Sequence, residues 1–267
     1  MKYKNKSMII DAFKWTGDQD QIEDPIWIVE AIKRGEISFA DLSSNLYKRS
    51  ANEISPLFIA GDIIPFNIQF NKYESKKWLE GPFAEWIKQL PVKEVFMVAG
   101  NHDAYFESIS ATNLGLFRQA TNFKLNYLKN STLVYHSEDG KAIKIFGTPY
   151  CHRFGTWPFM RDESYMEEKF KEIPDDVDII ISHDPPYGVG QVDCILQECR
   201  NSRETLENLG NIALSNRIKE TNFKLLVCGH IHSGDHSLFN KCVNVSHLDE
   251  FMDPCYEPFY TEIETYP

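Results

Sequence analysis

The middle of the chain reads Val98-Ala99-Gly100-Asn101-His102-Asp103, and the apolar run Val95-Phe96-Met97 comes directly before it. The apolar run predicts a buried β-strand. An amide, an imidazole and a carboxylate side chain then follow one another. In open α/β sheets, ligands bind beyond the carboxyl ends of the strands. We therefore interpret this strand end as part of a functional site.

The same arrangement occurs three more times along the chain. Apolar runs end in Gly61-Asp62, in Ser182-His183-Asp184 and in Gly229-His230-Ile231-His232. Each predicted strand thus presents an oxygen or nitrogen ligand at the same end. Four such strand ends at one edge of a sheet predict a metal site there.

The composition is that of an ordinary globular protein. The 267 residues are 42% hydrophobic and 25% charged, which suits one large domain or at most two. The formal net charge of -11 argues against broad binding of a nucleic-acid backbone, because such binding needs a basic face. A small phosphorylated substrate remains compatible with this charge if metal ions supply a local positive field.

The cysteines and apolar runs indicate the cellular setting. The six cysteines form no Cys-x-x-Cys pair, so neither a thiolate metal site nor a redox motif is predicted. We interpret them as free thiols and, with no signal peptide in the sequence, we expect a cytoplasmic location. The apolar runs are far shorter than the roughly 20 residues of a membrane helix, so we expect no membrane association.

Further patterns predict the remaining elements. Helical spacing is seen in the segments 25–35, 74–90, 105–128, 163–171 and 209–220. A turn at Asp139-Gly140 between two apolar runs, 132–135 and 142–147, predicts a hairpin. Alternation around Val243, Val245 and Tyr260 to Ile263 suggests closing antiparallel strands.

The domain organisation is predicted to be simple. Residues 51–267 form one domain, and residues 1–50 form an atypical N-terminal segment, which is either a replaced first strand or an appendage.

Taken in order, the four strand-end motifs resemble the signature motifs of the calcineurin-like metallophosphoesterases. The resemblance covers roughly residues 55 to 250. Gly147-Thr148-Pro149 and His183-Asp184-Pro185-Pro186-Tyr187-Gly188 also resemble the small branch that contains the metallophosphoesterase-domain proteins and many bacterial and phage relatives. The resemblance implies an α/β fold, a four-layer α/β/β/α sandwich of mixed sheets, with a two-metal site at one sheet edge.

The resemblance also implies a role for each motif residue. Asp62 bridges two divalent ions, Asn101, His183 and His230 bind the second ion, and His232 binds the first. Mixed nitrogen and oxygen ligands suit Mn, Fe, Zn or Ni. His102 faces the leaving-group oxygen as a proton donor, and Asp103 orients it.

The front of the chain departs from the family pattern. The family opens with Asp-x-His, and this chain contains no such triplet. The nearest candidate is Asp11-Ala12-Phe13, in which Phe13 takes the place of the histidine and cannot bind a metal. We therefore predict a complete second-metal site and a weak or empty first one, with Asp11 as a candidate ligand.

Other residues are candidates for substrate binding. His152 and Arg153 lie in a loop rich in aromatic residues and either grip a substrate phosphate or belong to an ordinary surface loop. Five aromatic residues could wall a base-stacking pocket or simply pack in the core: Phe66, Tyr105, Tyr150, Trp157 and Tyr187.

The motif series predicts a metal-dependent phosphodiesterase that hydrolyses a small nucleotide-like diester with a metal-activated water. The rival hypothesis is a weakened binding module that holds a nucleotide or a protein partner through a single metal. The missing histidine supports the rival, whereas His102 speaks against it, because a pure binder needs no proton donor.

Overall fold

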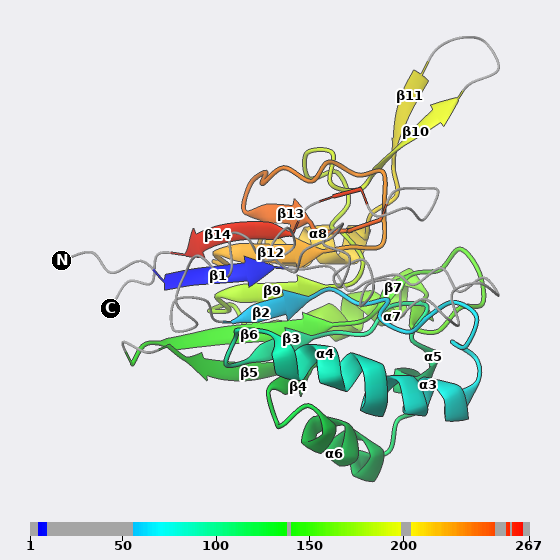
Figure 1. The fold of residues 1–267 in the computed structure, drawn as a ribbon. Coiled ribbons are helices and arrows are strands. Elements are labelled where there is room, and N and C mark those ends of the chain that lie inside the picture. Colours follow the sequence, from blue (N-terminus) through cyan, green and yellow to red (C-terminus); the bar gives the residue numbers. More distant parts are fainter. Residues whose placement is uncertain are drawn as a thin grey trace.

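The computed structural model describes residues 5–9, 56–137, 140–198, 204–248, 255–256 and 258–263 (Figure 1). The predicted helix at 25–35 lies outside these residues. The division at residue 50 stays a prediction, although strand β1 of the N-terminal segment pairs with β2 of the main domain.

Two five-stranded mixed sheets form the centre of the fold. The first sheet has the order β14-β1-β2-β3-β4, and its strands are β1 (Asn5–Ile9), β2 (Leu57–Ile59), β3 (Val95–Met97), β4 (Leu125–Tyr127) and β14 (Phe259–Ile263). The second sheet has the order β13-β12-β9-β6-β5, and its strands are β5 (Ser131–His136), β6 (Ala142–Thr148), β9 (Ile179–Ser182), β12 (Leu225–Cys228) and β13 (Cys242–Asn244). In each sheet four strands are parallel, and one edge strand, β14 or β5, is antiparallel.

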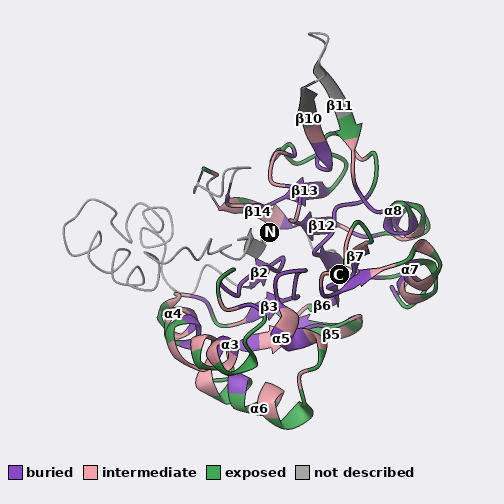
Figure 2. Ribbon diagram, turned by 90° about the vertical axis from the view of Figure 1, so that its right-hand side faces the viewer, coloured by how far each residue is buried: buried purple, intermediate pink, exposed green. Residues whose placement is uncertain are grey.

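Helices lie outside both sheets (Figures 1 and 2). The first sheet is accompanied by α3 (Lys72–Trp78), the π-helical η2 (Leu79–Phe83), α4 (Ala84–Gln89), α5 (Ala104–Glu107) and α6 (Ala111–Ala120). The second sheet is accompanied by α7 (Glu163–Phe170) and α8 (Ile212–Ile218). The predicted four-layer α/β/β/α arrangement is therefore confirmed.

Alternation along the strands produces the two apolar layers of each sheet. Phe58 of β2 and Phe96 of β3 pack with Ile181 and Val227 of the other sheet in one cluster. Neighbouring strand residues such as Leu57 belong instead to the cluster that includes the helices. Successive side chains of a strand point to opposite faces, so continuous apolar runs are needed where both faces are covered.

The helix predicted over 74–90 is present as three joined pieces. α3, η2 and α4 follow one another without a gap, and the π-helical turn contains Pro82. Proline lacks an amide proton and crowds the preceding turn, so a locally widened helix accommodates it. Asn71 caps the start of α3 through its side chain.

The hairpin β5–β6 and helix α7 are confirmed, but two other predictions need correction. In place of the helix expected over 105–128 the structure has two helices, α5 and α6, of which the second ends at Ala120, and residues 125–127 form β4. Asn122 and Phe123 have φ values of +53° and +59°, which cannot continue a right-handed helix. In the predicted closing strands, β14 is antiparallel to β1, whereas β13 is parallel to β12.

Two small ribbons complete the described structure. β7 (Cys151–His152) pairs with β8 (Met160–Arg161), and β10 (Cys194–Glu198) pairs with β11 (Glu204–Asn208) in a hairpin that projects from the body of the molecule (Figure 1). The five described cysteines are free thiols. Across the described ranges, no helix has the length and apolar character needed to cross a bilayer. The cytoplasmic location stays a prediction.

Candidate metal centre

The candidate centre lies where four loops meet at the carboxyl ends of parallel strands. Asp62 and Asn101 follow β2 and β3 of the first sheet, while His183 and His230 follow β9 and β12 of the second. Asp62, His183 and His230 each offer one ligand atom, and these three atoms lie within 4.8 Å of one another. The site therefore draws its ligands from both sheets.

A backbone carbonyl group orients the His183 ring. Its Nδ1 lies 2.8 Å from the carbonyl oxygen of Ala60, which can only accept a hydrogen bond. In the neutral ring, Nε2 therefore carries a lone pair. That nitrogen lies 2.9 Å from Asn101 Oδ1 and 3.5 Å from Asp62 Oδ2. A nitrogen lone pair and two oxygen atoms that converge in this way suit a bound cation.

His230 offers a further nitrogen atom suited to a cation. Its Nε2 is buried and has no hydrogen-bond partner among the described residues. An unpaired buried polar atom costs free energy unless something binds it. Loss of hydration on burial, and then the neighbouring His183, lower the pKa of His230 to about 3. The imidazole is therefore neutral, which is the form that binds metals.

Two glycines allow the loops to come this close. Gly61 and the following Asp62 have φ values of +106° and +56°. A Cβ atom on Gly100 would lie 2.2 Å from Asp62 Oδ1 and 2.5 Å from His183 Cε1. The Gly-Asp and Gly-Asn pairs of the sequence thus meet a steric need of the site.

His102 lies beside the cluster and is held by two contacts. Its backbone amide donates to Asp62 Oδ1 at 2.8 Å, and its ring Nδ1 lies 2.9 Å from Gln69 Oε1. Gln69 is buried, and its Nε2 donates to the carbonyl oxygen of Phe66. The amide oxygen therefore faces His102, so Nδ1 of His102 carries a proton.

Asp103 does not orient His102 through a hydrogen bond, contrary to the expectation. Its Oδ1 accepts the amides of Ile63 and Ile64, and its Oδ2 accepts the amide of Gly100. Because a buried carboxylate needs donors, Asp103 ties the loop after β2 to the loop after β3. Gln69 is the partner that sequence reasoning missed. The available signal was a pair of amides, Asn67 and Gln69, within the apolar segment Ile63 to Phe70.

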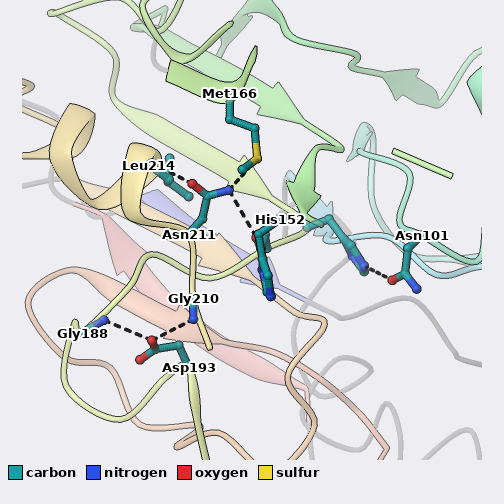
Figure 3. A network of polar contacts seen from close by, with 10 residues as sticks. Asn101, His152, Met166, Gly188, Asp193, Gly210, Asn211 and Leu214 are labelled. Carbon is teal, nitrogen blue, oxygen red and sulfur yellow. Dashed lines mark hydrogen bonds and ion pairs between the residues drawn. The ribbon is translucent and has the colours of Figure 1, made fainter. Parts of the chain in front are cut away.

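His152 belongs to a buried network beside the centre (Figure 3). Asp184 Oδ2 accepts from the His152 amide at 2.9 Å, contacts His152 Nδ1 at 3.0 Å and accepts from Asn211 Nδ2 at 3.2 Å. Asn211 also caps α8 by accepting from the Leu214 amide. The hydrogen bond to Asp184 raises the pKa of His152. The His152 ring lies 6.2 Å from that of His230, so a positive charge can be held near the cluster.

The other predicted site residues are not brought into the cluster. Arg153 forms an exposed ion pair with Asp162, with Nε 2.7 Å from Oδ1. His232 is half-buried, two residues after His230, and lies outside the three-residue cluster that the described chain contains. Asp11 falls outside the described residues. Asp62, His183 and His230 are among the residues that the sequence analysis assigned to the second ion, and the number of ions stays a prediction.

The five aromatic candidates fall into three groups. Tyr105 and Tyr150 are buried in the core, as the plainer interpretation expected. Tyr187 is exposed. Phe66 and Trp157 instead lie against His102, with ring centroids 5.6 and 4.8 Å away.

Sequence comparison finds similarity to phosphoesterases. A sequence model of the family described as calcineurin-like phosphoesterase matches residues 35–234. The UPF0046 protein C25E10.12 of Caenorhabditis elegans is 27% identical over 282 residues, which cover 97% of this chain and 93% of that protein. Metallophosphoesterase domain-containing protein 1 of Homo sapiens is 27% identical over 173 residues, which cover 57% of this chain.

The relatives differ in how much of their length is matched. This chain spans 48% of the human protein and only 16% of a probable rhamnogalacturonate lyase C of Emericella nidulans, which is 27% identical over 175 residues. One solved structure superposes with a TM-score of 0.54 at 16% identity and covers 93% of this chain and 92% of its own. That likeness concerns the fold alone.

Proposed function

This chain belongs to the calcineurin-like phosphoesterase family, and on that premise we propose that it is a metal-dependent phosphodiesterase for a small nucleotide-like diester. The single observation that carries the proposal is the convergence of Asp62, Asn101, His183 and His230 from two sheets. Membership of this family supports the assignment of the chain as a hydrolase. The preference for a small diester is supported by the net charge of -11, which disfavours long nucleic-acid substrates.

The described ligands fit a divalent cation. Two imidazole nitrogens with carboxylate and amide oxygens form a mixed set that suits Mn, Fe, Zn or Ni, and we propose Mn²⁺ as the first ion to test. A divalent cation bound there would supply positive charge that lowers the pKa of a water and offsets charge on phosphoryl oxygens. We keep a second, weaker cation site at Asp62 and His232, with Asp11, as part of the proposal.

The side chains around the cluster have separable tasks in this proposal. Gln69 Oε1 accepts from Nδ1 of His102, so the ring gives a proton to the leaving oxygen from Nε2 only in its doubly protonated form, in which the Gln69 oxygen still pairs with Nδ1. Asp184 raises the pKa of His152, and the protonated form of this ring suits a non-bridging phosphoryl oxygen. Asp103 keeps the two loops that carry Asp62 and Asn101 together.

The second candidate function is a binding module with a single metal ion. It is favoured by one observation: within the described residues, only one cluster of potential metal ligands is present. The pairing of His102 with buried Gln69 favours the enzyme, because a binder has no use for an oriented proton donor.

The test is hydrolysis of bis(4-nitrophenyl) phosphate by the full chain at increasing Mn²⁺. We expect saturable, metal-dependent turnover that falls by at least about a hundredfold in His230→Ala, because that variant removes a ligand. His136→Ala changes an exposed histidine on β5 and is the matched control. Absence of turnover at every metal concentration, with one ion still bound, would contradict the enzyme and support the binding module.

A further inference from the structure

Phe66 and Trp157 lie against His102, and Phe70 lies against Trp157. We call these three residues the His102 aromatic group: Phe66, Phe70 and Trp157. Phe66 and Trp157 have ring centroids 6.2 Å apart, and Phe70 and Trp157 have centroids 5.7 Å apart. Phe66 is 46% exposed and Phe70 is 67% exposed. Large apolar side chains that share one exposed patch mark a binding surface more often than single exposed ones do.

The segment that carries Phe66 and Phe70 is held firmly. Gln69 Nε2 donates to the Phe66 carbonyl at 2.9 Å, and Ser75 Oγ donates to the Ile68 carbonyl at 2.9 Å. Asn71 begins helix α3 directly after Phe70. Both rings are therefore presented by an ordered turn. Trp157 arrives from a separate segment after β7, so the group is assembled by the fold.

The position of the group relates it to the reaction. Trp157 and Phe66 contact the ring of His102, which is the proposed proton donor to the leaving oxygen. A substrate part that covers these rings is therefore attached to the leaving oxygen. None of the three residues is charged, and aromatic faces stack well on planar heteroaromatic rings, with little preference for sequence.

We propose that the His102 aromatic group is a subsite that stacks the base of a nucleoside leaving group. The inference rests on the proposed function for the orientation of the substrate, and it adds the chemical class of the leaving group. It also explains why aromatic rings remain exposed beside a polar metal centre.

The test compares two ligands that share a ribose and a phosphate but differ by the base. Calorimetric titration of the Mn²⁺-loaded full chain with adenosine 5′-monophosphate and with ribose 5-phosphate measures the contribution of the base. We expect about tenfold tighter binding of the nucleotide, since stacking on an aromatic side chain is worth about that much. Phe70→Ala should remove most of this advantage and leave the affinity for ribose 5-phosphate unchanged, while Phe70→Tyr should keep it.

Phe123→Ala is the matched control, because Phe123 is 63% exposed and follows α6, outside the group. Equal affinities for the two ligands, or an advantage that survives Phe70→Ala, would overturn the subsite. The hydrolysis assay keeps the two proposals apart. Turnover without a base advantage rejects the subsite alone, and a base advantage lost in Phe70→Ala without turnover rejects the hydrolase alone. If neither ligand binds, the subsite is rejected.

Discussion

Gln69 and His102 are 33 positions apart, and Gln69 Oε1 lies 2.9 Å from Nδ1 of His102, which places a proton on that nitrogen. Gln69 Nε2 donates to the Phe66 carbonyl, so the amide oxygen of Gln69 is the atom that faces Nδ1. The same glutamine therefore orders the turn that presents Phe66 and sets the tautomer of His102. At the scale of single residues, the proposed proton donor and the proposed base subsite are coupled through one buried amide.

This coupling predicts that Gln69→Leu affects substrates unequally. The variant keeps a side chain of similar size but leaves Nδ1 of His102 without an acceptor. We expect kcat to fall about tenfold for a cyclic nucleotide, whose leaving alkoxide needs a proton. The loss should be small for bis(4-nitrophenyl) phosphate, whose leaving group is stable as an anion. Steady-state kinetics with both substrates measures the difference.

Gln119→Leu is the control for this variant, since Gln119 is exposed on α6. An equal loss for both substrates would assign Gln69 a purely structural role.

At the scale of elements, the loops after β2 and β3 pack so closely that only glycine fits at position 100. We expect Gly100→Ala to destabilise the fold by about 1–3 kcal/mol through overpacking. Mn²⁺ binding should weaken as well, because the added methyl would displace Asp62 and His183. Urea unfolding in chelator and Mn²⁺ titration measure the two effects separately.

Gly115→Ala provides the opposite case. Gly115 lies in α6, and a Cβ atom there meets nothing within 4 Å. Alanine in a helix interior is favoured over glycine by about 0.5–1 kcal/mol, so this variant should be slightly more stable with unchanged Mn²⁺ binding. If Gly100→Ala behaved like Gly115→Ala, the steric account of the site would be wrong.

The same elements show which features could be predicted from the sequence. Asp62, Asn101, His183 and His230 follow their strands within a few residues, so an apolar run and its ending suffice to place them at one edge. The partner of Asp103 could not be predicted, because the amides of Ile63 and Ile64 are 40 and 39 residues away. Strand β4 is short, and its pairing with β3 outweighs the helical pattern that precedes it.

At the scale of the whole molecule, the centre joins the two halves of the sandwich. Asp62 and Asn101 belong to the first sheet, and His183 and His230 to the second. A cation held by all four would therefore link the sheets across the apolar layer in which Phe58 of one sheet and Val227 of the other are buried. The chain bears the cost of a left-handed backbone at His230, where φ is +69°, and a bound cation would pair the buried His230 Nε2.

We therefore expect the melting temperature of the full chain to depend on the metal ion. A ligand at about a hundred times its dissociation constant stabilises the folded state by about 2.7 kcal/mol. For a chain of this size, that corresponds to a rise of about 5–10 °C on adding Mn²⁺ to chelator-treated protein. Differential scanning calorimetry with and without Mn²⁺ measures the shift.

His230→Ala separates two contributions to stability: the cost of the buried His230 nitrogen in chelator, and the stabilisation gained when Mn²⁺ binds. In chelator the variant should be at least as stable as the original chain, because the unpaired nitrogen is removed. In Mn²⁺ it should lose most of the rise, whereas His136→Ala should keep it. If His230→Ala is destabilised equally with and without Mn²⁺, then His230 is an ordinary packing residue and the two sheets are not joined through a cation.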